Sequence, residues 1–102
     1  MNTVYSKNNV LIRLTEERWF HVVENHDELA GRIKEVLDTV AEPDIIAKGI
    51  KNELLVAKKI NTRWLVVVYS ERDSKDGFII TAFTTSRIQY LLKKEIIWTK
   101  QL

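Results

Sequence analysis

Two histidines are the side chains of this chain that could move protons near neutral pH. They are His21 and His26, and they lie five residues apart. A helical pair of zinc ligands needs a spacing of three or four residues, which brings both rings to one face. The sequence also has no cysteine, so a thiolate ligand and a cysteine nucleophile are both excluded. These residues therefore indicate proton transfer rather than a metal site.

Motifs for nucleotide binding and metal-dependent hydrolysis are missing. The sequence has no GxxxxGK[ST], no GxGxxG and no HExxH. Its acidic residues are scattered, whereas a two-metal nuclease needs clustered carboxylates. The 16 basic and 14 acidic residues give a net charge of +2, which permits a polyanionic partner without requiring one. Local recognition of a phosphate group remains compatible with this pattern.

The overall composition predicts one globular domain, residues 1–102. Hydrophobic residues make up 45% and charged residues 29% of the chain, a balance that argues against disorder. No apolar run approaches the roughly 20 residues of a membrane span, and the N-terminus lacks the apolar segment of a signal peptide. The absence of cysteine suits a reducing compartment. We therefore expect a cytoplasmic protein, with no membrane association and no cofactor.

The first half of the sequence predicts two helices. Thr15 reads as an N-cap with two glutamates in the first turn behind it. Apolar residues then recur every three or four positions from Trp19 to Val23, and His26 falls on the same face. A second helix is expected from about Leu29 until Pro43, because the residue before a proline avoids the helical conformation.

The second half changes to the period of β-strands. Residues 54–60, 64–69 and 78–83 are short runs rich in β-branched and aromatic side chains. Residues 61–62 predict a tight hairpin turn, and residues 76–77 predict the turn before the last of these runs. The run 64–69 is apolar on both faces, so we expect it to be the central strand of an antiparallel meander.

The remaining segments complete the predicted fold. A last helix is expected from Ser86 to about Glu95. Residues 10–14 and 96–98 could each add a strand, and residues 44–46 could be extended. The fold class is therefore predicted to be α+β, with two N-terminal helices packed on an antiparallel β-meander, a C-terminal helix and no parallel crossover.

Three stretches, taken together, carry a resemblance to a group of nucleases. They are RLTEERWFHVVENH at residues 13–26, WLVVVY at residues 64–69 preceded by AKK, and GFIITAFTTS at residues 77–86. Their order resembles the phage and mobile-element nuclease families grouped with barnase, EndoU, the tRNase colicins and RelE. Those families share two N-terminal helices followed by a four-stranded antiparallel sheet. The resemblance covers roughly residues 13–86.

This resemblance implies a metal-independent endoribonuclease of the small toxin type, in which the 2′-OH of RNA attacks its own phosphate and leaves a 2′,3′-cyclic end. A histidine would move protons, a lysine or arginine would stabilise charge on the phosphate, and a serine or threonine would orient a phosphate oxygen. RNA is then the expected partner, and an antitoxin or immunity protein would be a second one. Carried over, the candidate catalytic residues are His26, His21, Lys58, Arg63, Thr81, Thr85 and Ser86.

Every candidate also has a structural interpretation. His26 shares a face with apolar residues and could cap the end of a helix, and His21 lies on a polar face. Lys58 lies on a half-buried side of its strand, which is unusual for a lysine, and Arg63 could be a surface charge at a hairpin end. The hydroxyl residues could serve as a strand former and as helix caps.

Two alternative functions fit the same sequence. A catalytically inactive member of the fold could bind RNA or a protein. The discriminating feature is whether a histidine lies within reach of a cationic or hydroxyl side chain across a cleft. An interaction module, for example a homodimer joined through an edge strand, predicts an exposed apolar patch and no basic pocket.

Overall fold

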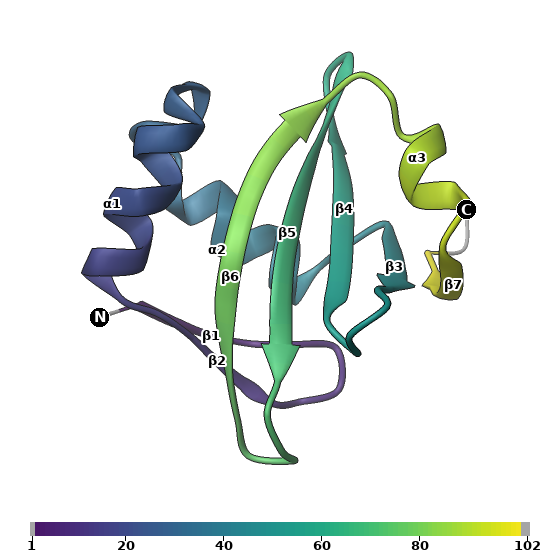
Figure 1. Ribbon diagram of the computed structural model, residues 1–102, viewed down its shortest axis with the longest axis horizontal. Helices are drawn as coiled ribbons and strands as arrows, with labels where there is room; N and C mark the ends of the chain where they lie inside the picture. Colours follow the sequence, from purple (N-terminus) through teal and green to yellow (C-terminus); the bar gives the residue numbers. More distant parts are fainter. Residues whose placement is uncertain (1, 101–102) are drawn as a thin grey trace.

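The computed structural model describes residues 2–100, which form one mixed β-sheet with helices beside it and on both of its faces (Figure 1). The α+β class expected from the sequence is confirmed. In chain order the elements are β1 (Asn2–Tyr5), β2 (Leu11–Leu14), α1 (Glu16–Asn25), the 3-10 turn η1 (Asp27–Leu29), α2 (Ile33–Ala41), β3 (Ile45–Lys48), β4 (Leu54–Ile60), β5 (Arg63–Glu71), β6 (Asp76–Thr85), α3 (Gln89–Leu92) and β7 (Glu95–Thr99).

The seven strands lie in the order β1-β2-β6-β5-β4-β3-β7, so β5 is central, as predicted. The consecutive strands β3 to β6 pair antiparallel, which confirms a meander. The expectation of a wholly antiparallel sheet without a parallel crossover is wrong, because β2 pairs parallel with β6. Two helices and three strands separate β2 from β6, and only a tight hairpin forces two strands to run antiparallel.

The N-terminal helices follow the sequence closely at the start of α1 and at the end of α2. The Thr15 hydroxyl accepts a hydrogen bond from the Arg18 amide at 3.1 Å, as expected of an N-cap. Helix α2 ends at Ala41, two residues before Pro43. It begins later than predicted, because residues 27–29 form η1 and Gly31 adopts a left-handed φ of 76° that interrupts the helical path.

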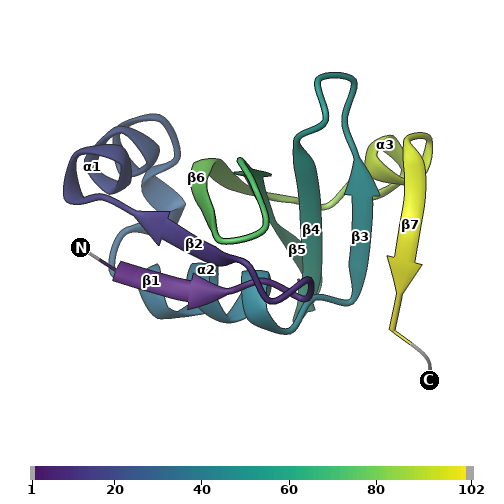
Figure 2. The ribbon, with the colours of Figure 1, turned by 90° about the horizontal axis from the view of Figure 1, so that it is seen from below.

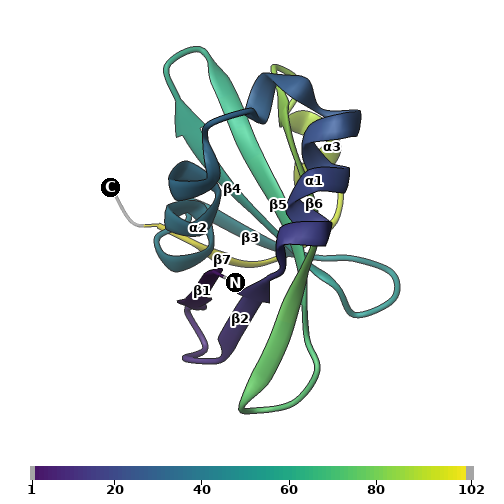
Figure 3. The same cartoon turned by 90° about the vertical axis from the view of Figure 1, so that its left-hand side faces the viewer.

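The helices pack in two different ways. Helix α2 contacts β1 as well as β4 and β5, and the sheet curls around it (Figure 3). Helix α1 lies beside β6 (Figure 1). It follows the part of β6 that extends beyond its pairing with β2 and has no neighbouring strand on that edge. Helix α3 lies on the opposite side of the sheet from α2 (Figure 2). The main hydrophobic cluster therefore lies between the curled sheet, α1 and α2.

Two predicted boundaries in the second half are wrong. Residues 76–77 lie in β6 rather than in a turn, and the Asp73 carboxylate closes the turn before them by accepting bonds from the Lys75 and Asp76 amides. The last helix was expected over residues 86–95 but spans only Gln89–Leu92. The β-branched residues that follow it join the sheet as β7, which pairs with β3.

Strand β1 is an element that the sequence did not predict. It has only four residues, it is mostly exposed, and it lies at an edge of the sheet against β2. A short, largely polar edge strand gives little periodic signal. Among residues 2–100, no helix has the length and apolar character needed to cross a membrane.

Candidate functional site

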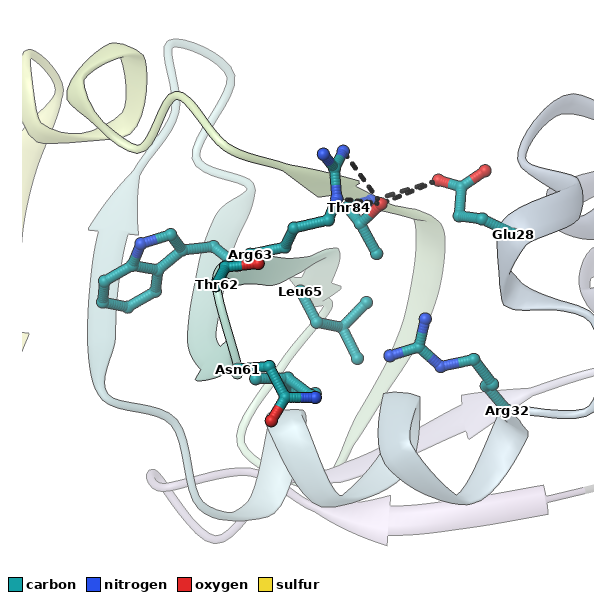
Figure 4. Close-up of a pocket in the computed structure, with 9 residues that line it drawn as sticks. Glu28, Arg32, Asn61, Thr62, Arg63, Leu65 and Thr84 are labelled. Carbon is teal, nitrogen blue, oxygen red and sulfur yellow. Dashed lines mark hydrogen bonds between the residues drawn. The ribbon is translucent and has the colours of Figure 1, made fainter.

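A pocket of about 250 Å³ opens beside the β4–β5 hairpin, on the sheet face that α2 covers (Figure 4). Three parts of the chain line it: the segment from η1 to the start of α2, the hairpin, and the end of β6. The lining residues are Glu28, Arg32, Ile60, Asn61, Thr62, Arg63, Trp64, Leu65 and Thr84.

The floor of the pocket is set by the register of β5 and β6. Leu65 is fully buried and lies directly opposite Thr84, so both side chains point to the same face. The Arg63 guanidinium donates to Thr84 Oγ1 from Nε at 3.4 Å and from Nη2 at 3.3 Å. Arg32 approaches from the other side of Leu65 (Figure 4). Two guanidinium groups therefore flank an apolar floor with a hydroxyl beside it.

Glu28 closes the open edge of β6 at this pocket. Its Oε2 accepts from the Thr84 amide at 3.3 Å and from the Thr84 hydroxyl at 3.2 Å. Burial alone would raise the pKa of Glu28. Hydrogen bonds from its own amide and from Thr84, together with the nearby His26, outweigh burial and hold the pKa below its ordinary value. The Glu28 carboxylate is therefore ionised near neutral pH.

His26 lies behind Glu28, at the junction of α1 and η1. Its Nδ1 is 3.9 Å from Glu28 Oε2, and its ring centroid is 5.9 Å from that of Phe83. Its side chain is 35% exposed, so solvent and a ligand can reach the imidazole. A histidine, a carboxylate, a hydroxyl and a guanidinium therefore follow one another in space as His26, Glu28, Thr84 and Arg63.

The two arginines of the pocket differ in their partners. Arg32 binds Glu35 through Nε at 3.1 Å and Nη2 at 2.9 Å. This hydrogen-bonded pair raises the pKa of Arg32 and lowers that of Glu35. Arg63 has no carboxylate contact among the described residues, since its hydrogen bonds go to a hydroxyl. Arg63 therefore offers the less neutralised positive charge to a ligand.

Of the predicted site residues, Arg63 lines the pocket, and His26 lies next to the lining residue Glu28 without lining the pocket itself. Lys58 lies nearby: it pairs with Leu65, which pairs with Thr84, so the three share one face of the sheet. Two strand spacings separate Lys58 from Thr84, roughly 10 Å. Lys58 does not line the pocket itself.

The other predicted site residues lie elsewhere. His21 is exposed on α1, with Nδ1 3.3 Å from Glu24 Oε1. Thr81 and Thr85 pair with Val68 and Trp64, so they point to the face that α3 covers, away from Thr84. The Thr85 hydroxyl accepts from the Arg87 amide at 2.9 Å, which is a turn-closing role. Ser86 is exposed after β6 and has no side-chain bond among the described residues.

Sequence reasoning missed Glu28, Arg32 and Thr84. Strict alternation from the buried Ala82 would have selected Thr84 over its neighbours, since residues two apart share a face. No comparable signal existed for Glu28 and Arg32. Their positions depend on η1 and on the break at Gly31, which the helical periodicity did not reveal.

Residues 2–100 contain no group of three or more His, Asp or Glu side chains placed to hold a metal ion. No known protein family, curated protein or solved structure matches this chain. The chemistry of the pocket is therefore the basis on which a function can be proposed.

Proposed function

We propose that this protein is a metal-independent endoribonuclease of the toxin type, acting at the pocket between Arg63 and Glu28. One observation carries this proposal: two guanidinium groups flank one small pocket, with a hydroxyl, an ionised carboxylate and a histidine beside them. Paired arginines suit a phosphate because their planar N–H groups match its oxygens. Part of the seven-stranded fold, α1 and α2 followed by the antiparallel strands β3 to β6, has the order expected from the nuclease families that the sequence resembles.

The two arginines would hold the phosphate that is attacked. Negative charge grows on the non-bridging phosphate oxygens as the 2′-oxygen approaches, and preorganised donors stabilise that charge. Arg63 and Arg32 would supply the positive charge from two sides, and the Thr84 hydroxyl, which donates to Glu28 and accepts from Arg63, would hold both of these side chains in place. The two hydrogen bonds from Arg32 to Glu35 hold its guanidinium in place.

The two proton-transfer groups would be Glu28 and His26. Glu28 accepts the proton of the 2′-OH while the bond from the 2′-oxygen to phosphorus forms. The bond from phosphorus to the 5′-oxygen breaks, and a protonated His26 gives its proton to that leaving oxygen. The products are a 2′,3′-cyclic phosphate on one fragment and a free 5′-hydroxyl on the other. Glu28 thus supplies the second acid–base group that the sequence alone did not reveal.

A second function has an observation of its own. The Glu28 carboxylate is already engaged by the amide and hydroxyl of Thr84, where it satisfies an open strand edge. A purely structural Glu28 would leave the pocket able to bind a phosphate without cleaving RNA. The protein would then be an inactive, RNA-binding member of the same fold.

The test is incubation of the purified protein with total RNA and labelled tRNA in EDTA. We expect cleavage that survives EDTA and leaves cyclic phosphate ends. Arg63→Ala should lower the rate about 10²–10³-fold, as loss of a charge-stabilising donor does, and His26→Ala about 10²–10⁴-fold. His21→Ala is the matched control, because His21 is exposed on α1 outside the pocket, and its rate should stay within about twofold of the parent.

The outcomes separate the two functions. A folded parent protein that binds RNA through Arg63 without cleaving it would support the binding role and overturn the nuclease. If His21→Ala and His26→Ala lowered the cleavage rate equally, the reaction would take place outside this pocket.

A further inference from the structure

The positive charge of the chain is concentrated in its last part. Residues 86–102 hold four basic residues and one acidic residue, a net charge of +3, whereas residues 1–85 hold 12 basic and 13 acidic residues, a net charge of −1. The basic residues are Arg87, Lys93, Lys94 and Lys100. None of these four forms an ion pair with a described residue.

Helix α3 lies on the face of the sheet opposite α2, which we call the α3 face (Figure 2). Arg87, Lys94 and Lys100 line hollows on this face. It carries the half-buried side chains Ile45, Leu55, Trp64, Phe83, Ile88 and Ile96 around a small buried cluster. Helix α3 has four residues and covers only part of this surface. Apolar side chains therefore remain accessible beside it, and Tyr90 on α3 is itself 59% exposed.

Two hollows on the α3 face combine apolar floors with basic rims. The first, about 130 Å³, has Leu55, Val66, Phe83 and Leu91 in its lining together with Arg87 and Lys94. The second, about 320 Å³, is lined by Ile45 and Trp64 together with Asp44, Lys59, Thr99 and Lys100. Each hollow therefore has an apolar wall and two lysine or arginine side chains.

We infer that the α3 face docks an acidic, amphipathic segment of a partner protein. Apolar side chains of that segment would fill the two hollows, where burial supplies most of the affinity. Its carboxylates would meet the basic residues on the rims, and such charge complementarity raises the association rate and fixes the orientation. The α3 face lies across the sheet from the Arg63 pocket, so this inference does not depend on the proposed nuclease activity.

A protein segment fits this face better than RNA does. The accessible surface of the first hollow is almost wholly apolar and comes mainly from Leu55, Val66, Phe83 and Leu91, whereas its polar neighbours Thr85, Arg87, Tyr90 and Lys94 stand at its border. Single-stranded RNA is held by stacking on exposed aromatic rings and by hydrogen bonds to base edges. Trp64 and Phe83 are half-buried in the sheet surface, which leaves Tyr90 as the one exposed ring beside the first hollow among the described residues.

The test begins with selection from a displayed library of random 16-residue peptides against the full chain. We expect enriched peptides to carry Asp or Glu together with apolar residues three or four positions apart. Fluorescence anisotropy with one labelled peptide should show at least tenfold weaker binding to the double variant R87E/K94E. The matched variant R18E/K34E reverses two exposed charges on α1 and α2 and should stay within about twofold of the parent.

A second measurement locates the peptide and separates it from RNA. Amide chemical shifts of Leu55, Val66 and Phe83 should move when the peptide is added. The inference is overturned if no acidic peptide is enriched, or if R18E/K34E weakens binding as much as R87E/K94E. It is also overturned if a labelled single-stranded RNA binds the parent and R87E/K94E abolishes that binding, because the α3 face would then bind nucleic acid.

Discussion

On the face that α1 and α2 cover, 15 buried hydrophobic side chains join one cluster, whereas the α3 face buries only four and leaves six half-buried. The covered face has two helices of ten and nine residues, and the α3 face has one of four. Strands β3 to β6 contribute to both faces, so the difference arises from the helices and from the curl of β1 and β2 around α2. Well-packed surroundings hold side chains in fixed positions, and incomplete cover leaves apolar surface for a partner.

The location of the pocket follows from this difference. It lies where the cover of α2 ends, with the fully buried Leu65 as its floor and Arg32 anchored to α2 by Glu35. A charged group that must face a reacting phosphate benefits from such a rigid base. The α3 face offers hollows and unpaired cations, which suit an adaptable contact instead.

The largest expected difference between the faces concerns core packing. Leu29→Ala removes a fully buried side chain from the covered face, and we expect it to lower the free energy of unfolding by about 3 kcal/mol. Leu91→Ala makes the same change on the α3 face, where a one-turn helix can relax into the space, and should cost about 1–2 kcal/mol. Urea denaturation measures both values. An equal or larger cost for Leu91→Ala would mean that the faces are packed alike.

Helix capping should show a smaller difference of the same kind. Thr15→Ala removes the hydroxyl that caps α1 and should cost about 1 kcal/mol. Ser86→Ala, near α3, removes a hydroxyl without a bond among the described residues, and α3 has no side-chain cap. That control should change the free energy of unfolding by less than about 0.5 kcal/mol. A cost for Ser86→Ala that matched Thr15→Ala would show a cap on α3.

The smallest effect concerns pH. The Arg32 partner lowers the pKa of Glu35 below its ordinary value of 4.5. The stabilisation is therefore present above pH 4.5 and is lost as the pH falls through the lower, folded-state pKa. Glu35→Gln should remove at most about 0.5 kcal/mol at pH 7, because water screens this partly exposed pair.

The same variant should make the free energy of unfolding less dependent on pH below 4.5. Lys94→Gln is the control from the α3 face, where the lysine has no ion pair among the described residues, and it should leave the pH dependence unchanged. An unchanged pH dependence in Glu35→Gln would mean that the pair with Arg32 does not form in solution.

Much of the fold could be predicted from local patterns. The Thr15 cap, the stop before Pro43 and the central position of residues 64–69 each depend on a few neighbouring residues. The parallel pairing of β2 with β6 and the short α3 depend on which distant strand is available. Such long-range choices leave no periodic trace in one sequence.

The site was accessible to sequence reasoning only in part. His26 and Arg63 stood out because their residue types suit the chemistry; Arg63 lines the pocket and His26 lies beside it, next to Glu28. Arg32 and Glu28 are residues of types that are common on protein surfaces, and they lie in a polar stretch of the sequence. Their approach to the hairpin is created by the turn at η1 and the left-handed Gly31, neither of which the helical pattern predicted.

The most direct test of the proposed phosphate site is an NMR titration with a short single-stranded oligonucleotide that lacks the 2′-hydroxyl and so cannot be cleaved by 2′-OH attack. We expect the largest shifts at the amides of Arg63, Leu65 and Thr84 and at Arg32 Nε, around the pocket on the covered face. Shifts centred instead on Arg87 and Lys94 would place the nucleic acid on the α3 face and contradict the assignment of the two faces.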